Sequence, residues 1–122
     1  MSKKILAVDD EPDILKVIIF RLKKAGYDVK TAINGQIALD MIAEDRPDII
    51  LLDISLPLLN GYEVCRRIKA DDNFKSIPVM FLTASTASEG FKKRAEEAGA
   101  QAYMFKPFDY EELLEKVKKL LG

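Results

Sequence analysis

The sequence contains no histidine, no tryptophan and a single cysteine, Cys65. Without histidine, the chain cannot supply a Ser-His-Asp or Cys-His catalytic set, a histidine general base or a phosphohistidine of its own. One thiol cannot form an internal disulfide, and zinc sites draw mainly on histidine and on several cysteines. These absences exclude the commonest hydrolytic centres, the usual zinc sites and a disulfide-stabilised scaffold.

The sequence also lacks an excess of charge and a long apolar run. Nineteen basic residues stand against 20 acidic ones, so we expect no general attraction to nucleic acid or to an anionic membrane. The first apolar run, residues 5–8, is ended by Asp9, which argues against a signal peptide or a membrane span. We therefore expect a cytoplasmic protein.

Length and composition indicate one domain over residues 1–122. Of the 122 residues, 48% are apolar and 32% are charged, which excludes a disordered chain. A chain of this length buries about two-thirds of the surface that its unfolded form exposes, so a core forms without a disulfide or a structural metal. Cys65 is expected to fill that core as a small apolar side chain.

Five strand-like apolar runs alternate with five amphipathic, helix-like segments. The predicted strands are residues 4–9, 27–32, 48–53, 77–83 and 102–105. The predicted helices are residues 12–25, 36–45, a segment after Gly61, a segment from Thr86 to Gly99 and a segment after Asp109. Thr86 with Glu89, and Asp109 with Glu112, have the spacing of helix-capping pairs. The alternation predicts an α/β fold, in which helices cover both faces of a parallel sheet.

Polar residues follow the predicted strands, at the sheet edge where open α/β folds bind ligands. They are Asp9 and Asp10 after the first strand, Asp53 at the end of the third, Thr83 after the fourth and Lys106 after the fifth. If the first and third strands are neighbours, three carboxylates meet. Two unit charges about 4 Å apart repel by about 4 kcal/mol at an effective dielectric constant near 20.

Such a cluster needs either a protonated carboxyl group or a bound cation. Oxygen ligands without sulfur or imidazole favour Mg²⁺. A carboxylate beside that ion, with a lysine and a hydroxyl group nearby, can accept a phosphoryl group, because the transfer needs mainly positioning and charge neutralisation. Asp53 is the expected acceptor because it lies between the cation ligands and the side that carries Lys106 and Thr83.

Each residue also has a plainer interpretation when it is taken alone. Asp9, Asp10 and Glu11 precede Pro12 and could complement a helix dipole. Asp53 could be a solvated loop residue, and Lys106 with Pro107 could form a turn. The combination at one edge favours the functional interpretation.

Four motifs resemble the response-regulator receiver domain of two-component signalling, in order and over essentially the whole chain. They are Val-Asp-Asp-Glu at residues 8–11, Leu52–Asp53 followed by Pro57 and Gly61, Leu-Thr-Ala at residues 82–84, and Phe-Lys-Pro-Phe at residues 105–108. The resemblance implies a flavodoxin-like, doubly wound receiver fold, with strand order 2-1-3-4-5 and five flanking helices.

The resemblance also implies the chemistry of the site. Asp53 would be phosphorylated, with Mg²⁺ as the cofactor, by a sensor histidine kinase or a histidine phosphotransfer protein. The implied metal ligands are Asp10, Asp53 and the backbone carbonyl of Ser55, and Asp9 would act through water. Lys106 would pair with the phosphoryl oxygens and Thr83 would hydrogen-bond one of them.

The remaining implied roles concern switching. Tyr103 would be the aromatic residue that changes position when the domain switches, and Pro107 would follow a cis peptide bond. Leu56 stands where the family often has methionine, and Ser55 and Ser85 occupy positions that tune phosphoryl hydrolysis. Phosphorylation would change the surface of the fourth helix, fifth strand and fifth helix for a downstream target protein. The small, polar segment 84–90 is expected to rearrange easily.

The first helix carries a second apolar face beside its core stripe. The core stripe comprises Leu15, Ile18, Ile19 and Leu22, and the second face comprises Ile14, Val17 and Arg21. This second face is expected to be partly exposed, and the resemblance implies that the kinase docks on it. Scattered exposed apolar residues are also ordinary on protein surfaces.

Other functions stay open at this stage. An aspartyl-phosphate phosphohydrolase usually has a second acid two residues beyond its nucleophile, where this chain has Ser55. A constitutive dimerisation module would not need the acidic cluster. We expect no enzyme activity beyond self-phosphotransfer and autodephosphorylation, and either a monomer or a phosphorylation-dependent dimer. Because no further segment follows Gly122, we expect a stand-alone regulator or phosphorelay intermediate, unless the chain is an excised domain.

Overall fold

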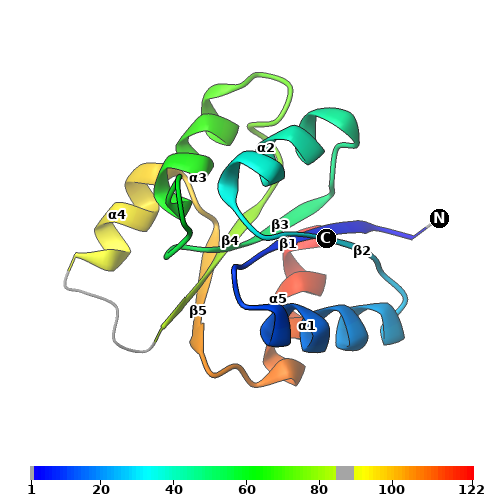
Figure 1. Ribbon diagram of the computed structural model, residues 1–122. Coiled ribbons are helices and arrows are strands. Elements are labelled where there is room, and N and C mark those ends of the chain that lie inside the picture. The colour runs from blue at the N-terminus through cyan, green and yellow to red at the C-terminus, as the bar shows by residue number, and fades with distance from the viewer. Residues whose placement is uncertain (1, 85–89) are drawn as a thin grey trace.

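The computed structural model describes residues 2–84 and 90–122, and Figure 1 shows its ten elements. In chain order they are β1 (Lys4–Val8), α1 (Pro12–Lys24), β2 (Asp28–Ala32), α2 (Gly35–Glu44), β3 (Ile49–Asp53), α3 (Gly61–Ala70), β4 (Val79–Ala84), α4 (Phe91–Ala98), β5 (Ala102–Lys106) and α5 (Tyr110–Leu121). The predicted alternation is confirmed. Thr86, Glu89 and Ser85 lie outside the described residues, and so does most of segment 84–90.

All five strands are parallel and lie in the order β2-β1-β3-β4-β5. This confirms the order that the resemblance implied. Strand β3 is buried along its whole length, whereas β2, at the sheet edge, mixes buried and more exposed residues. The carboxyl ends of β1 and β3 are adjacent, since Val8 pairs with Leu52. The residues that follow these two strands therefore meet.

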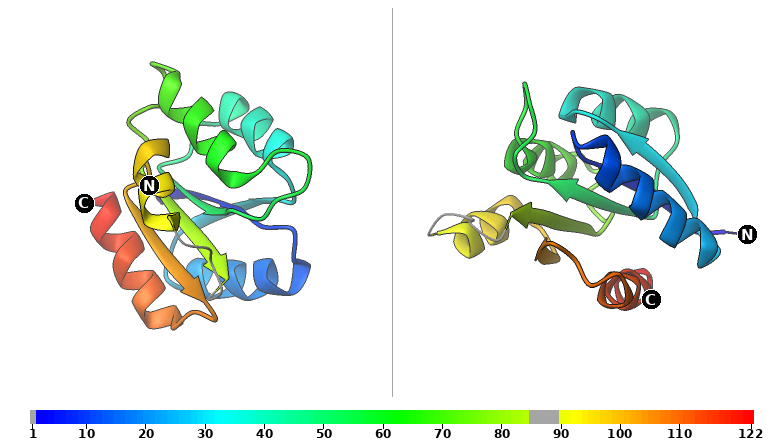
Figure 2. Two further views of the ribbon diagram at one scale, coloured as in Figure 1. Left: turned by 90° about the vertical axis from the view of Figure 1, so that its left-hand side faces the viewer. Right: turned by 60° about the horizontal axis from the view of Figure 1, so that its bottom comes forward.

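Two helical layers cover the sheet, as Figures 1 and 2 show. Helices α1 and α5 pack on one face through a buried cluster that includes Leu15, Ile18, Leu22, Leu113 and Val117. Helices α2, α3 and α4 pack on the other face through a cluster that includes Ala38, Ile42, Val64, Ile68 and Ala95.

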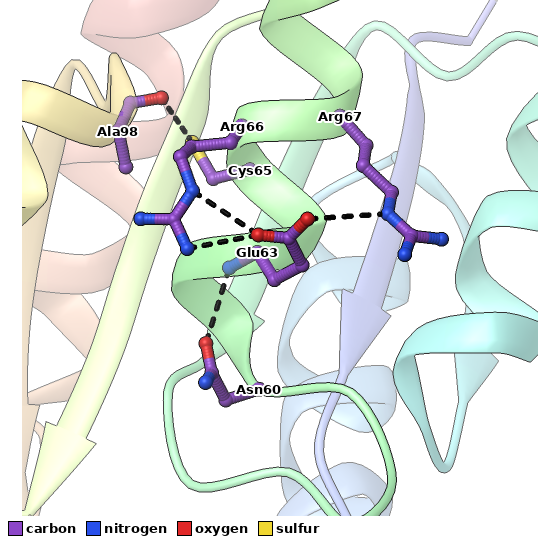
Figure 3. A network of polar contacts seen from close by, with 6 residues as sticks. All are labelled: Asn60, Glu63, Cys65, Arg66, Arg67 and Ala98. Carbon is purple, nitrogen blue, oxygen red and sulfur yellow. Dashed lines mark hydrogen bonds and ion pairs between the residues drawn. The ribbon is translucent and has the colours of Figure 1, made fainter.

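Cys65 lies in the second of these layers and is fully buried, as expected. Its thiol donates a hydrogen bond of 3.2 Å to the carbonyl of Ala98, which joins α3 to the end of α4 (Figure 3). Burial raises the pKa of the thiol to about 11. The cysteine is a packing residue that is held protonated.

Helix boundaries follow local capping chemistry. Asn34, Asn60 and Asp109 precede α2, α3 and α5, and each side chain accepts a hydrogen bond from a backbone amide in the first turn. Gly26 and Gly99 follow α1 and α4 with φ angles of +97° and +92°, which residues with a side chain rarely adopt. No helix within residues 2–84 and 90–122 combines the length and apolar character that crossing a membrane requires.

Candidate metal centre

Three carboxylates meet at the carboxyl edge of the sheet. Asp9 directly follows β1, Asp10 is the next residue and Asp53 is the last residue of β3. One carboxylate oxygen from each lies within 4.8 Å of the others. Asp9 and Asp53 are 0% and 4% exposed, whereas Asp10 is exposed. The expected cluster is therefore observed, and Asp10 is its solvent-facing member.

Lys106, at the end of β5, brings the nearest positive charge into the cluster. Its ammonium lies 2.8 Å from Asp9 Oδ2, 3.4 Å from Glu11 Oε1 and 3.7 Å from Asp53 Oδ1. The Lys106–Pro107 peptide bond is cis, as the resemblance implied. The lysine thus forms its shortest ion pair with Asp9 rather than with the central Asp53.

The surroundings of the site raise the pKa values of both Asp53 and Lys106. Burial and the neighbouring charge of Asp9 raise the pKa of Asp53 to about 6, although Lys106 and the Ser55 amide oppose this shift. Burial alone would lower the pKa of Lys106, but its hydrogen bond to Asp9 and the charges of Asp53, Asp9 and Glu11 raise it above the ordinary value. One ammonium therefore does not fully compensate the carboxylates.

Asp9 has both carboxylate oxygens engaged within the protein. Oδ2 accepts from Lys106, and Oδ1 accepts a 2.9 Å hydrogen bond from the backbone amide of Glu11. Within residues 2–84 and 90–122, Asp53 accepts only a longer, 3.4 Å hydrogen bond, which the Ser55 amide donates. Asp10 and Asp53 are therefore freer than Asp9 to bind an ion directly.

The donor set suits a hard divalent cation. The cluster contains three carboxylates and the Lys106 ammonium, which leaves negative charge for a cation to neutralise when all four groups are ionised. The candidate ligands carry oxygen only, and Mg²⁺ prefers oxygen ligands and retains several of its waters. The exposed position of Asp10 leaves room for those waters. The residues thus fit Mg²⁺.

Thr83 and Tyr103 lie on the two strands beyond β3. Thr83 is 5% exposed near the end of β4, where it pairs with Phe105. Tyr103, on β5, is half-buried, and its ring centroid lies 5.2 Å from that of Phe91 and 5.5 Å from that of Phe105. Tyr103 therefore belongs to an aromatic cluster between α4 and β5.

The second apolar face of α1 is partly exposed, as expected, and its members differ in exposure and contacts. Val17 is 40% exposed. Ile14 is half-buried and lines a cleft of about 390 Å³ with Glu11, Lys106 and Pro107, among others. The Arg21 guanidinium lies 5.5 Å from the centre of the Tyr110 ring. Ile14 and Arg21 thus face the β5–α5 side.

Two site contacts were not predicted from the sequence. Glu11 was noted as a helix-start and motif residue without a site contact, yet it contacts Lys106 across 95 positions of sequence. Gly61 was noted as a motif residue, yet it lies directly against the backbone of Asp53. Both contacts depend on tertiary placement, and no local pattern signals them.

Comparison with known proteins agrees with this geometry. The family model of the response regulator receiver domain matches residues 5–118. The chemotaxis protein CheY4 of Vibrio cholerae is 32% identical, with a TM-score of 0.92, and the match covers 98% of this chain and 99% of that one. A CheY-like response regulator receiver domain protein of Methanospirillum hungatei JF-1 is 31% identical, with a TM-score of 0.92 and coverage of 99% and 94%.

A third solved structure bears on the metal. The receiver domain of the sensor histidine kinase PA1611 from Pseudomonas aeruginosa PAO1 is 33% identical, with a TM-score of 0.90, and the match covers 100% of this chain and 99% of that one. That receiver domain has a magnesium ion coordinated in its active site cleft. The similarity extends over at least 94% of each of these chains.

Proposed function

Because the chain belongs to the response regulator receiver domain family, we propose that it is a signalling switch in which Asp53 accepts a phosphoryl group. Members of this family have a phospho-acceptor role in two-component signalling. One observation carries the assignment to Asp53. This carboxylate is almost fully buried, lies beside Asp9, Asp10 and Lys106, and accepts no short hydrogen bond among the described residues.

Mg²⁺ is the proposed cofactor, held by Asp10, Asp53 and the Ser55 carbonyl, with Asp9 acting through water. When bound, the ion neutralises charge on the carboxylates and on the phosphoryl oxygens. The magnesium ion in the similar PA1611 receiver domain supports this assignment. The two occupied oxygens of Asp9 support an indirect role for that residue.

In the proposed reaction, an Asp53 oxygen attacks the phosphorus of a phosphohistidine on a sensor histidine kinase or a histidine phosphotransfer protein. A P–O bond forms, the P–N bond breaks, and the released imidazole takes up a proton. Lys106 lies 3.7 Å from Asp53 Oδ1, so its ammonium needs only a small movement to pair with the incoming oxygens. The face of α1 that carries Ile14, Val17 and Arg21, with the cleft beside Ile14, is the proposed docking site for this partner.

Phosphorylation adds about −1.5 to −2 charges at Asp53. The Thr83 hydroxyl would donate a hydrogen bond to a phosphoryl oxygen, and Tyr103 would shift within its aromatic cluster. The expected effect is a change in the populations of two surfaces formed by α4, β5 and α5. A groove of about 640 Å³ lies there, lined by residues that include Lys92, Tyr103 and Phe105. We assign this groove to a downstream target protein.

The test is incubation of the chain with Mg²⁺ and phosphoramidate, followed by mass spectrometry. We expect a gain of one phosphoryl group, which is lost in Asp53→Asn and retained in Asp72→Asn. Asp72 is a suitable control because its side chain is 92% exposed and forms a surface ion pair with Lys75. Donor turnover without accumulation of the phosphorylated chain would instead indicate a phosphohydrolase. Absence of both modification and turnover would indicate a constitutive interaction module.

A further inference from the structure

The first residue of α3, Gly61, packs directly on the backbone that carries Asp53. A Cβ atom at position 61 would overlap the carbonyl oxygen of Asp53 and would stand 2.8 Å from the Cα of Ile54. Both neighbours are backbone atoms, which cannot move aside as the end of a flexible side chain can. A side chain at position 61 therefore has to displace either α3 or the end of β3.

Hydrogen bonds link the start of α3 to the turn after β3. The Ile54 carbonyl accepts hydrogen bonds from the amides of Gly61 at 2.9 Å and Leu56 at 3.0 Å. Asn60 caps α3 by accepting a hydrogen bond from the Glu63 amide, as Figure 3 shows. The start of α3 and the turn after β3 are therefore coupled through adjacent hydrogen bonds.

The necessary displacement is comparable to the tolerance of a reactive site. The 2.8 Å approach to the Ile54 Cα is closer than the 3.0 Å that real Cβ atoms keep, and restoring ordinary contact at 3.4 Å takes a shift of 0.6 Å (3.4 minus 2.8). Reactive groups are held within about 0.5 Å of their productive positions. A misplacement of about 1 Å can lower a rate by about a hundredfold.

We propose that Gly61 is a positioning residue for Asp53. Its missing side chain lets α3 lie close enough to set the Asp53 carboxylate against Asp9 and Asp10, which belong to the segment after β1. This inference rests on the proposed role of Asp53 as metal ligand and phosphoryl acceptor. It assigns Gly61 no contact with the ion or with the phosphoryl group.

Gly35 provides a matched control. It is also the first residue of its helix, α2, and it also follows a capping asparagine. A Cβ atom there would stand 2.5 Å from Val64 Cγ2 and 2.9 Å from the Leu59 carbonyl oxygen, with no contact to Asp53 among the three nearest atoms. Gly35→Ala therefore crowds the packing of α2 on α3 without pressing directly on the acceptor.

The experiment compares wild type, Gly61→Ala and Gly35→Ala by calorimetric titration with Mg²⁺ alone and by the rate of phosphorylation from phosphoramidate. We expect Gly61→Ala to weaken Mg²⁺ affinity about tenfold or more and to slow phosphorylation by at least as much, as misplacement of a ligand and acceptor implies. Gly35→Ala should change both less than Gly61→Ala does, because its added methyl group meets Val64 and Leu59 rather than the backbone of Asp53 and Ile54. Crowded packing should still lower its melting temperature.

Equal losses in the two variants, or wild-type affinity in Gly61→Ala, would overturn the proposal. To separate placement from folding, the titrations are run at 10 °C with trimethylamine N-oxide, which stabilises folded chains. If Gly61→Ala stays unfolded under these conditions while Gly35→Ala folds, Gly61 is required for folding and the proposal is wrong. If wild type binds Mg²⁺ but takes up no phosphoryl group, the proposed function fails, and the Mg²⁺ comparison still decides the role of Gly61.

Discussion

Replacement of Asp53 by asparagine should stabilise the metal-free protein at neutral pH. The buried Asp53 carboxylate faces Asp9 and Asp10, and burial with the charge of Asp9 raises its pKa from 3.8 to about 6. Asparagine keeps nearly the same shape and removes the charge. The variant should therefore gain the free energy that the native protein loses by ionising this group.

The size of the gain follows from the pKa. A change of one pKa unit corresponds to about 1.36 kcal/mol, so the shift from 3.8 to about 6 gives an upper value of about 3 kcal/mol. Solvent near the exposed Asp10 screens part of the repulsion and lowers the expected gain to about 2 kcal/mol. For 122 residues, about 2 kcal/mol raises the melting temperature by about 8 °C.

The pH dependence has a definite sign. Because the pKa of Asp53 is higher in the folded protein, the unfolded chain loses this proton first as the pH rises. Asp53 therefore lowers stability progressively between pH 3.8 and about 6, and its full cost is present above that window. The advantage of Asp53→Asn should be small near pH 4 and complete near pH 7.

The assay is thermal unfolding followed by circular dichroism at pH 4 and pH 7, with EDTA or with excess Mg²⁺. Mg²⁺ should raise the stability of wild type more than that of Asp53→Asn, because the variant lacks a metal-binding carboxylate. Asp72→Asn removes the same charge at a side chain that is 92% exposed and should shift the melting temperature by less than about 2 °C. An unchanged or lower melting temperature for Asp53→Asn in EDTA, or a gain of equal size at both pH values, would refute this electrostatic account.

Two other substitutions test neighbouring features in the same unfolding assay. Leu58 has a φ angle of +69° and is 91% exposed. Because asparagine tolerates this backbone conformation, Leu58→Asn should raise the melting temperature by about 2–4 °C. A decrease would show that the leucine makes stabilising contacts. Lys106→Gln removes the ion-pair partner of the fully buried Asp9 and should cost about 3 kcal/mol in EDTA. Excess Mg²⁺ should restore part of this loss, and an unchanged melting temperature would contradict the pairing.

The number, type and sequence of the elements were predicted from residue patterns, because periodic burial is a local property. The continuous apolar run of β3 and the alternating pattern of β2 correspond to a central strand and an edge strand. Capping residues also determined helix ends locally, as Asn60 and Asp109 show. The order of strands came only from the family resemblance, since local patterns do not reveal which strands pair.

The candidate site, like the fold, was predicted from the sequence only in part. The sequence by itself determined that Asp9, Asp10, Asp53 and Lys106 lie at the carboxyl ends of strands, because each directly follows or ends an apolar run. Only the tertiary structure decided that Lys106 pairs most closely with Asp9 and that Gly61 lies against Asp53. Such contacts depend on sub-ångström differences in distance between segments far apart in the chain, and residue order alone does not encode these distances locally.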